Sequence, residues 1–157
     1  MDQIEELRYL VLAAQRDGSR RLAEALRPLD VTAAQAEVLT ILASASQPLS
    51  VKELGAQLVC EPGSPSRLTR TITAAGLAEL STDPADARVT RVTLTPQGRA
   101  KASAIAEIER RFHEELRSVL PDSAELDGLI ATLRQLAEAG PSGQALARRR
   151  EAENKPK

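Results

Sequence analysis

Aromatic residues and cysteine are almost absent from this sequence. The 157 residues include one Tyr (Tyr9), one Phe (Phe112), one Cys (Cys60), one His (His113) and no Trp. A core must therefore be built from Leu, Val, Ile and Ala, which favours helices, and aromatic platforms for single-stranded nucleic acid are disfavoured. One Cys and one His form no disulfide and give too few ligands for a zinc site, so no metal or other cofactor is expected.

Long apolar runs and a basic leader segment are also lacking. No apolar run approaches the roughly 20 residues of a membrane-spanning helix. The first ten residues, MDQIEELRYL, carry acidic groups early, unlike a signal peptide. We therefore expect a cytoplasmic protein without membrane contacts. The net charge of −1 does not by itself indicate a nucleic-acid partner.

What the sequence does contain is helical periodicity at both ends. Apolar residues recur at steps of three and four in residues 4–27, in residues 96–119 and again before Gly140. Pro28 and Pro121 mark breaks in this pattern. We predict a single domain over residues 1–140, with a mobile basic tail at residues 141–157.

The middle of the chain predicts three short helices and a hairpin. Thr32 with Gln35, and Ser50 with Glu53, have the spacing of capping boxes that begin helices. A third helix over RLTRTITAA ends at Gly76. The segments LAELS and VTRVTLT then flank a charged loop, TDPADAR, which is typical of a β-hairpin.

This order predicts a mainly α fold with a small β-hairpin wing. The winged helix-turn-helix core spans about residues 32–95, with long helices before and after it. In such a core the third helix presents its N-terminal half to a DNA groove, and the hairpin lies beside it. Arginine suits contacts to guanine edges or phosphate, and small hydroxyl residues permit close backbone approach. The candidate DNA contacts are Ser64, Ser66, Arg67, Arg70 and Arg88. Asp86 is the candidate orienting partner of Arg88.

The segment DPADARVTRVTLTPQGRA resembles the wing of the multiple antibiotic resistance regulator (MarR) family. The residues that match the family's pattern without a gap are Asp86, Arg88, Leu94, Thr95 and Gly98. The resemblance covers residues 4–140. It implies a homodimeric transcriptional regulator, commonly a repressor, that binds a pseudo-palindromic site in double-stranded DNA. It also implies dimerisation through helices at about residues 4–27 and 96–140.

The resemblance further implies a small-molecule effector, such as an aromatic acid, in a cleft between the dimer helices and the DNA-binding lobe. Tyr9 and His113 are candidate pocket residues, and a plain interface role is the alternative for each. Some relatives sense peroxides through a cysteine near the first helix. Cys60 lies elsewhere in the sequence, and we expect it to be a buried small hydrophobe, with a redox-active thiol as the alternative.

Two departures from the family pattern concern the DNA contacts. Ala87 stands where many members carry a first wing arginine, which leaves Arg88 as the main candidate there. The string Ser-Pro-Ser at residues 64–66 lies three residues later than the family spacing. Family spacing therefore starts the third helix near Pro62, whereas capping chemistry starts it at Pro65. Arg67 and Arg70 face outward in both alternatives.

An enzyme is not predicted, because the sequence has no glycine-rich phosphate loop, nucleophile elbow or metal cluster. The alternative to a DNA-binding regulator is a winged-helix module for protein–protein contact without a DNA target, which the low net charge would suit. The operator, the effector and the direction of regulation do not follow from the sequence.

Overall fold

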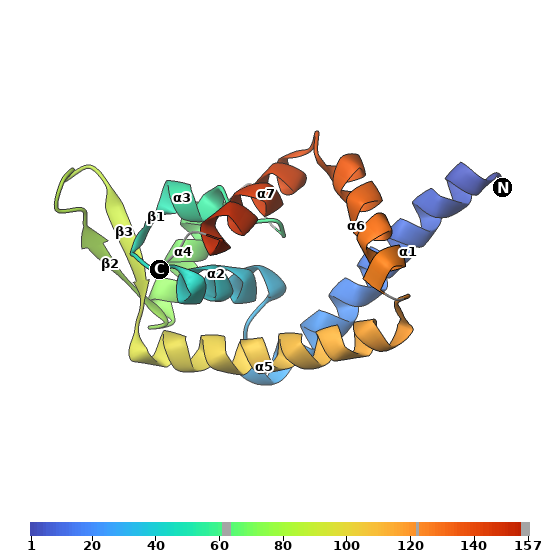
Figure 1. The fold of residues 1–157 in the computed structure, drawn as a ribbon. Coiled ribbons are helices and arrows are strands. Elements are labelled where there is room, and N and C mark those ends of the chain that lie inside the picture. Colours follow the sequence, from blue (N-terminus) through green and yellow to red (C-terminus); the bar gives the residue numbers. More distant parts are fainter. Residues whose placement is uncertain (61–63, 122, 155–157) are drawn as a thin grey trace.

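The protein was analysed as a computed structural model, which describes residues 1–60, 64–121 and 123–154 (Figure 1). Its helices are α1 (Gln3–Leu26), α2 (Ala33–Ser44), α3 (Val51–Gly55), α4 (Pro65–Ala74), α5 (Pro96–Val119), α6 (Ser123–Ala137) and α7 (Pro141–Glu153), with a 3-10 turn at Arg27–Leu29. The strands are β1 (Leu49–Ser50), β2 (Ala78–Thr82) and β3 (Thr90–Leu94). The predicted fold class, mainly α with a small β wing, is confirmed.

Side-chain caps begin the helices in the middle of the chain. The hydroxyl of Thr32 accepts the N–H of Gln35 at 3.2 Å, and the Gln35 side chain accepts the N–H of Thr32 at 2.8 Å. Ser50 and Glu53 make the same reciprocal pair at 3.2 and 2.7 Å. Both predicted capping boxes are therefore present, and each satisfies two backbone donors that the first helical turn leaves unpaired.

The start and end of α4 follow from backbone conformation. Ser64 has φ −148° and ψ 49°, which is not helical, and Pro65 is the first helical residue. This agrees with the start expected from capping, while the alternative start at Pro62 lies outside the described residues. Gly76 has φ +71°, a left-handed conformation that residues with a Cβ rarely adopt, and the chain turns there into β2.

The strands form an antiparallel sheet with the order β1-β3-β2. The predicted hairpin pairs Ala78 with Leu94 at its base and Thr82 with Thr90 towards its tip. β1 was not predicted, because Ser50 was assigned only as the cap of the next helix. It pairs Leu49 with Val92 and so attaches the connection between α2 and α3 to the wing.

An aliphatic core joins the helices to the sheet. Its largest fully buried side chains are Leu26, Leu39, Ile41, Leu54, Leu58, Ile72, Ile105, Val38 and Val92. Each buried Leu or Ile contributes roughly 1.5–3 kcal/mol to folding. A Cβ at Gly98 would lie 1.8 Å from the carbonyl oxygen of Leu77, so only glycine lets α5 approach the start of the wing this closely.

The long helices extend away from this core. α5 runs beneath α2 and the wing, and its far end lies with α1 and α6 on the opposite side of the molecule (Figure 1). Most of α1 and α6 is exposed. Among the described residues, no helix is both long and apolar enough to cross a membrane.

Residues 141–153 form the helix α7, and the prediction of a mobile tail is wrong for this part of the chain. Pro141 is the first helical residue, and Ala145 is buried. A Cβ at Gly143 would lie 2.1 Å from the carbonyl oxygen of Ala137, so α7 packs closely against the end of α6. Tertiary packing, which helical propensity alone does not report, orders this segment.

Candidate nucleic-acid interface

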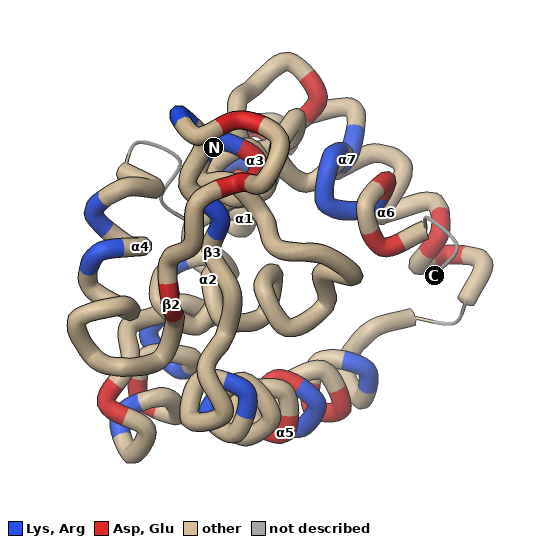
Figure 2. Tube along the Cα trace, turned by 90° about the vertical axis from the view of Figure 1, so that its left-hand side faces the viewer, with Lys and Arg blue, Asp and Glu red and all other residues tan. Residues whose placement is uncertain are grey.

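Helix α4 has one buried face and one exposed face that carries positive charge. Leu68, Thr69 and Ile72 point into the core, while Arg67 and Arg70 are exposed. Figure 2 shows the two basic positions of α4 at the outer edge of the molecule. Two guanidinium groups one turn apart suit a negatively charged groove.

The serines before these arginines lie at the beginning of α4. Ser64 is half-buried at the N-cap position and makes no capping hydrogen bond through its side chain, whereas Ser66 is exposed in the first turn. α4 starts close to α3, since a Cβ at Gly55 would lie 2.8 Å from Cγ of Pro65. The start of α4 is thereby fixed against α3, and Ser66 lies on its solvent side.

At the wing tip, Asp86 holds Arg88. The Arg88 Nε and Nη2 atoms donate to the two carboxylate oxygens of Asp86 at 3.0 and 3.1 Å, and the Arg88 backbone N–H also donates to Asp86 at 3.0 Å. The Arg88 side chain is 90% exposed. Its hydrogen bonds lower the pKa of Asp86. The predicted contact between Asp86 and Arg88 is present, and the guanidinium remains exposed to solvent.

The residue that anchors the wing is Asp83, which was not predicted. Its carboxylate accepts the backbone N–H groups of Ala85 and Asp86 at 2.7 and 3.1 Å and pairs with Nε of Arg91 at 2.5 Å. Arg91 also pairs with Glu53 at 2.7 Å. The charged loop is therefore tied to the beginning of α3 through a single arginine.

The opposite charges of Asp83, Arg91 and Glu53 stabilise one another. The hydrogen bond from Arg91 is the largest cause that lowers the pKa of Asp83. The pKa of Glu53 is also lowered, first by the backbone N–H of Ser50 and further by Arg91. Arg91 thus has a structural role in the wing. The side chain of Arg88, by contrast, remains exposed at the wing tip.

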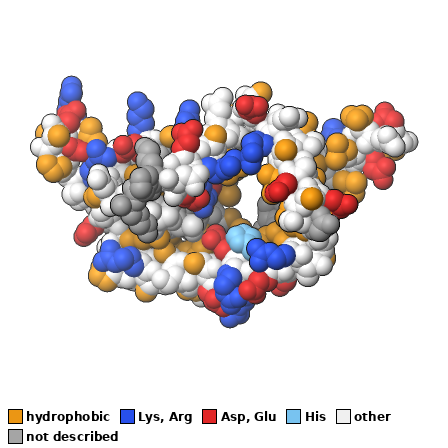
Figure 3. Space-filling model, in the orientation of Figure 1, with side chains coloured by type: hydrophobic (Ala, Val, Ile, Leu, Met, Phe, Trp, Pro, Cys, Tyr) orange, Lys and Arg blue, Asp and Glu red, His pale blue; other side chains and the backbone are white. Residues whose placement is uncertain are grey.

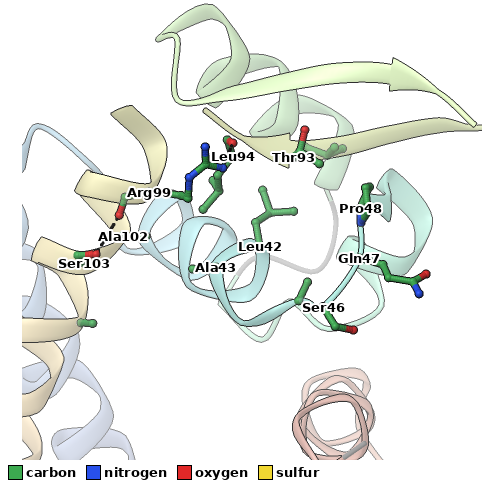
Figure 4. Close-up of a pocket in the computed structure, with 13 residues that line it drawn as sticks. Leu42, Ala43, Ser46, Gln47, Pro48, Thr93, Leu94, Arg99, Ala102 and Ser103 are labelled. Atoms are coloured by element: carbon green, nitrogen blue, oxygen red, sulfur yellow. Dashed lines mark hydrogen bonds between the residues drawn. The ribbon is translucent and has the colours of Figure 1, made fainter. Parts of the chain in front are cut away.

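A cavity of about 510 Å³ lies between the end of α2, strand β3 and the start of α5 (Figure 4). Leu42, Leu94 and Ala102 give it apolar walls. Arg99 and Ser103 supply polar groups at one side. The Arg99 guanidinium donates to the carbonyl oxygen of Leu94 at 2.6 Å.

The two residues predicted to line an effector pocket do not lie in this cavity. His113 lines a smaller hollow of about 270 Å³ with Glu109 and Arg110, on the face shown in Figure 3. Tyr9 is exposed on α1, and its ring lies 4.2 Å from the guanidinium carbon of Arg8. The described residues of a single chain therefore do not bring Tyr9 and His113 together around either hollow.

Cys60 is exposed, and the expectation that it is a buried hydrophobe is wrong. The chain turns outward after Leu58, and the N–H of Cys60 is held by Glu37. Desolvation of the thiol and the nearby Glu37 carboxylate raise the pKa of Cys60 to about 11. A raised pKa lowers the fraction of the reactive thiolate form.

Comparisons with known proteins agree with this geometry. A family model described as a winged helix DNA-binding domain matches residues 31–98. A mutant MarR from E. coli is 30% identical, with 83% of this chain and 95% of that chain covered and a TM-score of 0.63. A mutant E. coli MarR complexed with operator DNA is 29% identical, with 87% and 99% covered and a TM-score of 0.71.

A more distant structure shares the fold. It is Bordetella bronchiseptica BpsR, whose DNA binding is regulated by 6-hydroxynicotinic acid. It is 24% identical, covers 89% of this chain and 99% of that chain, and has a TM-score of 0.75. A search of curated proteins found no match. The three alignments cover 95–99% of those structures and 83–89% of this chain. Some residues of this chain therefore lie outside the shared fold.

Proposed function

Because this chain belongs to the MarR family of winged helix DNA-binding transcriptional regulators, we propose that it is a homodimeric, ligand-responsive repressor of a pseudo-palindromic operator. The family consists of regulators, and the chain is not an enzyme. The observation that carries the proposal is the outward placement of Arg67 and Arg70 on α4, beside an Arg88 that Asp86 holds at the wing tip.

The two parts of this surface have different tasks. α4 enters the major groove, where Arg67 and Arg70 donate to guanine edges or to phosphates, with Ser64 and Ser66 at the helix start near the backbone. Arg88 lies on the wing and enters the adjacent minor groove, where negative potential attracts arginine. Sequence preference then comes from α4, and much of the affinity comes from charge.

A dimer is supported by apolar surface on the outer helices. The exposed large apolar residues of α1, α6 and the end of α5 include Ile4, Leu7, Leu10, Val11, Val119, Leu129, Ile130, Leu133 and Leu136. Contiguous apolar surface of this kind marks an interface. A twofold dimer formed there places two α4 helices on half-sites about one DNA turn apart.

Ligand response is supported by the cavity at β3. It touches the end of α2, the inner strand of the wing and the start of α5. A small aromatic acid with its ring on Leu42 and Leu94 and its carboxylate on Arg99 would contact both the wing and α5. Such a ligand would shift the population between two spacings of the DNA-binding lobes.

The test is duplex binding measured against salt concentration. Duplexes are first selected from a random-sequence library by the wild-type protein at low salt. A regulator that neutralises several phosphates loses affinity steeply, with a slope of about −0.9 per phosphate contact in a plot of log affinity against log salt. Failure to select any duplex at low salt would overturn the proposal and favour a winged helix that contacts only protein.

A further inference from the structure

Glu37 is a buried carboxylate that the DNA contacts described above do not use. It lies on α2 and is 7% exposed. Its Oε1 accepts the N–H of Val59 and its Oε2 accepts the N–H of Cys60, both at 2.9 Å. Burying a carboxylate is costly unless hydrogen bonds replace water, and these two backbone donors supply them. Glu37 therefore fixes the chain shortly before α4 begins.

The positive charge facing Glu37 comes from α7. Nη1 of Arg149 lies 3.5 Å from Oε1 of Glu37, and the Arg149 side chain is only 24% exposed. Nε of the same arginine lies 3.4 Å from Glu153. Figure 1 shows α7 returning from α6 to α2. Ala145 is buried and Gly143 packs on Ala137, so the position of α7 is set by packing as well as by charge.

We propose that Glu37 is a positioning residue for DNA recognition, and that α7 controls this positioning through Arg149. Glu37 acts on DNA only through the backbone of Val59 and Cys60, which sets how the chain enters α4. The proposal rests on the proposed use of α4 in the major groove. It makes α7 a working part of the DNA-binding lobe.

The chemistry of the pair explains why Arg149 matters at a distance from DNA. Without Arg149, Glu37 is a buried charge with no cationic partner among the residues that the structure describes, a costly arrangement. Rotation of the Glu37 side chain towards solvent relieves that cost and weakens the bonds to Val59 and Cys60. Val59 and Cys60 are then held less firmly, and specific binding includes the cost of ordering them.

The first experiment uses Glu37→Gln in the full chain. Glutamine keeps the size of the side chain but offers one acceptor oxygen where glutamate offers two. We expect faster amide hydrogen exchange at Val59 and Cys60, and about a tenfold weaker affinity for the library-selected duplex. Affinity for a scrambled duplex of equal length should be unchanged, because Arg67 and Arg70 keep their charge. A general loss of folding would lower both affinities together.

The second experiment compares two neighbouring arginines of α7. Arg149→Met removes the charge that faces Glu37, and Arg148→Met removes an exposed charge one residue away. We expect about a tenfold loss of affinity for the selected duplex only in Arg149→Met. The salt slope should be unchanged, because no phosphate contact is lost. Adding Arg149→Met to Glu37→Gln should cause little further loss.

Two results would overturn the proposal while leaving DNA binding intact. One is wild-type affinity of Glu37→Gln despite faster exchange at Val59 and Cys60. The other is an equal loss in Arg148→Met and Arg149→Met with a shallower salt slope, which would make α7 a phosphate contact. If the wild-type protein selects no duplex at all, the proposed DNA function itself fails and this proposal fails with it.

Discussion

Asp86 binds Arg88 through both carboxylate oxygens, at 3.0 and 3.1 Å, while the arginine side chain remains 90% exposed. A charged side chain held in this way has lost rotamer freedom before any partner arrives. Ordering it at an interface therefore costs less than ordering a mobile arginine. The pair is suited to placing a cation at one fixed point of a DNA groove.

The first prediction concerns this pair. Arg88→Ala should weaken binding to a selected duplex by about 1–3 kcal/mol, because it removes both a charge and a groove contact. Asp86→Asn should weaken it less, since Arg88 keeps its charge but loses its fixed orientation. Competition binding on selected and scrambled duplexes measures both effects. Arg20→Ala, an exposed arginine on α1, is the control and should bind as wild type.

The second prediction concerns the pH dependence of Asp83. Because Arg91 lowers the pKa of Asp83 below its ordinary value of 3.8, the ion pair stabilises the fold fully above that value. This stabilisation is lost as pH falls through the lowered pKa. Asp83→Asn should therefore reduce the free energy of unfolding by a constant amount between pH 5 and 8. The difference from wild type should shrink below about pH 3.8.

Denaturant unfolding across this pH range measures the difference. The control is Asp83→Asn made in an Arg91→Met background, where the pH-dependent part should be smaller, because only the backbone N–H groups of Ala85 and Asp86 still lower the pKa of Asp83. A difference from wild type that stays the same down to pH 3 would contradict a carboxylate whose pKa is lowered in the folded protein.

The third prediction uses two glycines with opposite surroundings. A Cβ at Gly55 would lie 2.8 and 2.9 Å from the ring of Pro65, whereas a Cβ at Gly128 meets nothing within 4 Å. Gly55→Ala should cost about 1–3 kcal/mol of stability and displace the start of α4. Gly128→Ala, inside α6, should add about 0.5–1 kcal/mol.

Thermal unfolding and affinity for the selected duplex are measured on both glycine variants. Gly55→Ala should lose specific affinity even at temperatures where it is fully folded, because the arginines of α4 are displaced. Wild-type affinity in folded Gly55→Ala would mean that α4 tolerates movement at its start.

Local chemistry made much of this fold predictable. The capping residues Thr32 and Ser50, the left-handed Gly76 and Pro96 at a helix start each act within a few residues, so the sequence pattern alone placed those elements. The exposed faces of Arg67 and Arg70 followed from helical spacing around Leu68. These signals are short in range, and a single sequence displays them directly.

The features that the sequence did not predict depend on distant residues. Asp83 is one of several acids in the wing loop, and only the fold shows that Arg91 reaches both it and Glu53. The sequence around Glu37 carries no sign that its carboxylate accepts the N–H groups of Val59 and Cys60, which lie more than 20 residues away. α7 has a polar, arginine-rich sequence, and it is held by the packing of Gly143 on Ala137 and by the pair of Arg149 with Glu37. Long-range pairing of this kind leaves no local pattern.

The last prediction concerns the dimer. Leu10 on α1 is 60% exposed and lies in a row of apolar residues. Burying such a leucine against a second chain would stabilise a dimer, because it removes apolar surface from water. Leu10→Glu would place a charge in that interface, where it has no partner. We expect this variant to sediment as a monomer at micromolar concentration, and Leu133→Glu on α6 to do the same.

Leu80→Glu is the matched control for the dimer, because Leu80 is 50% exposed but lies on β2 in the wing. It should sediment as the wild-type dimer. A monomer engages one half-site at a time, so Leu10→Glu should bind a selected pseudo-palindromic duplex about 10²–10⁴-fold more weakly than wild type, while its affinity for a single half-site is retained. A wild-type protein that sediments as a monomer, or a Leu10→Glu variant that remains a dimer, would contradict an interface built from α1 and α6.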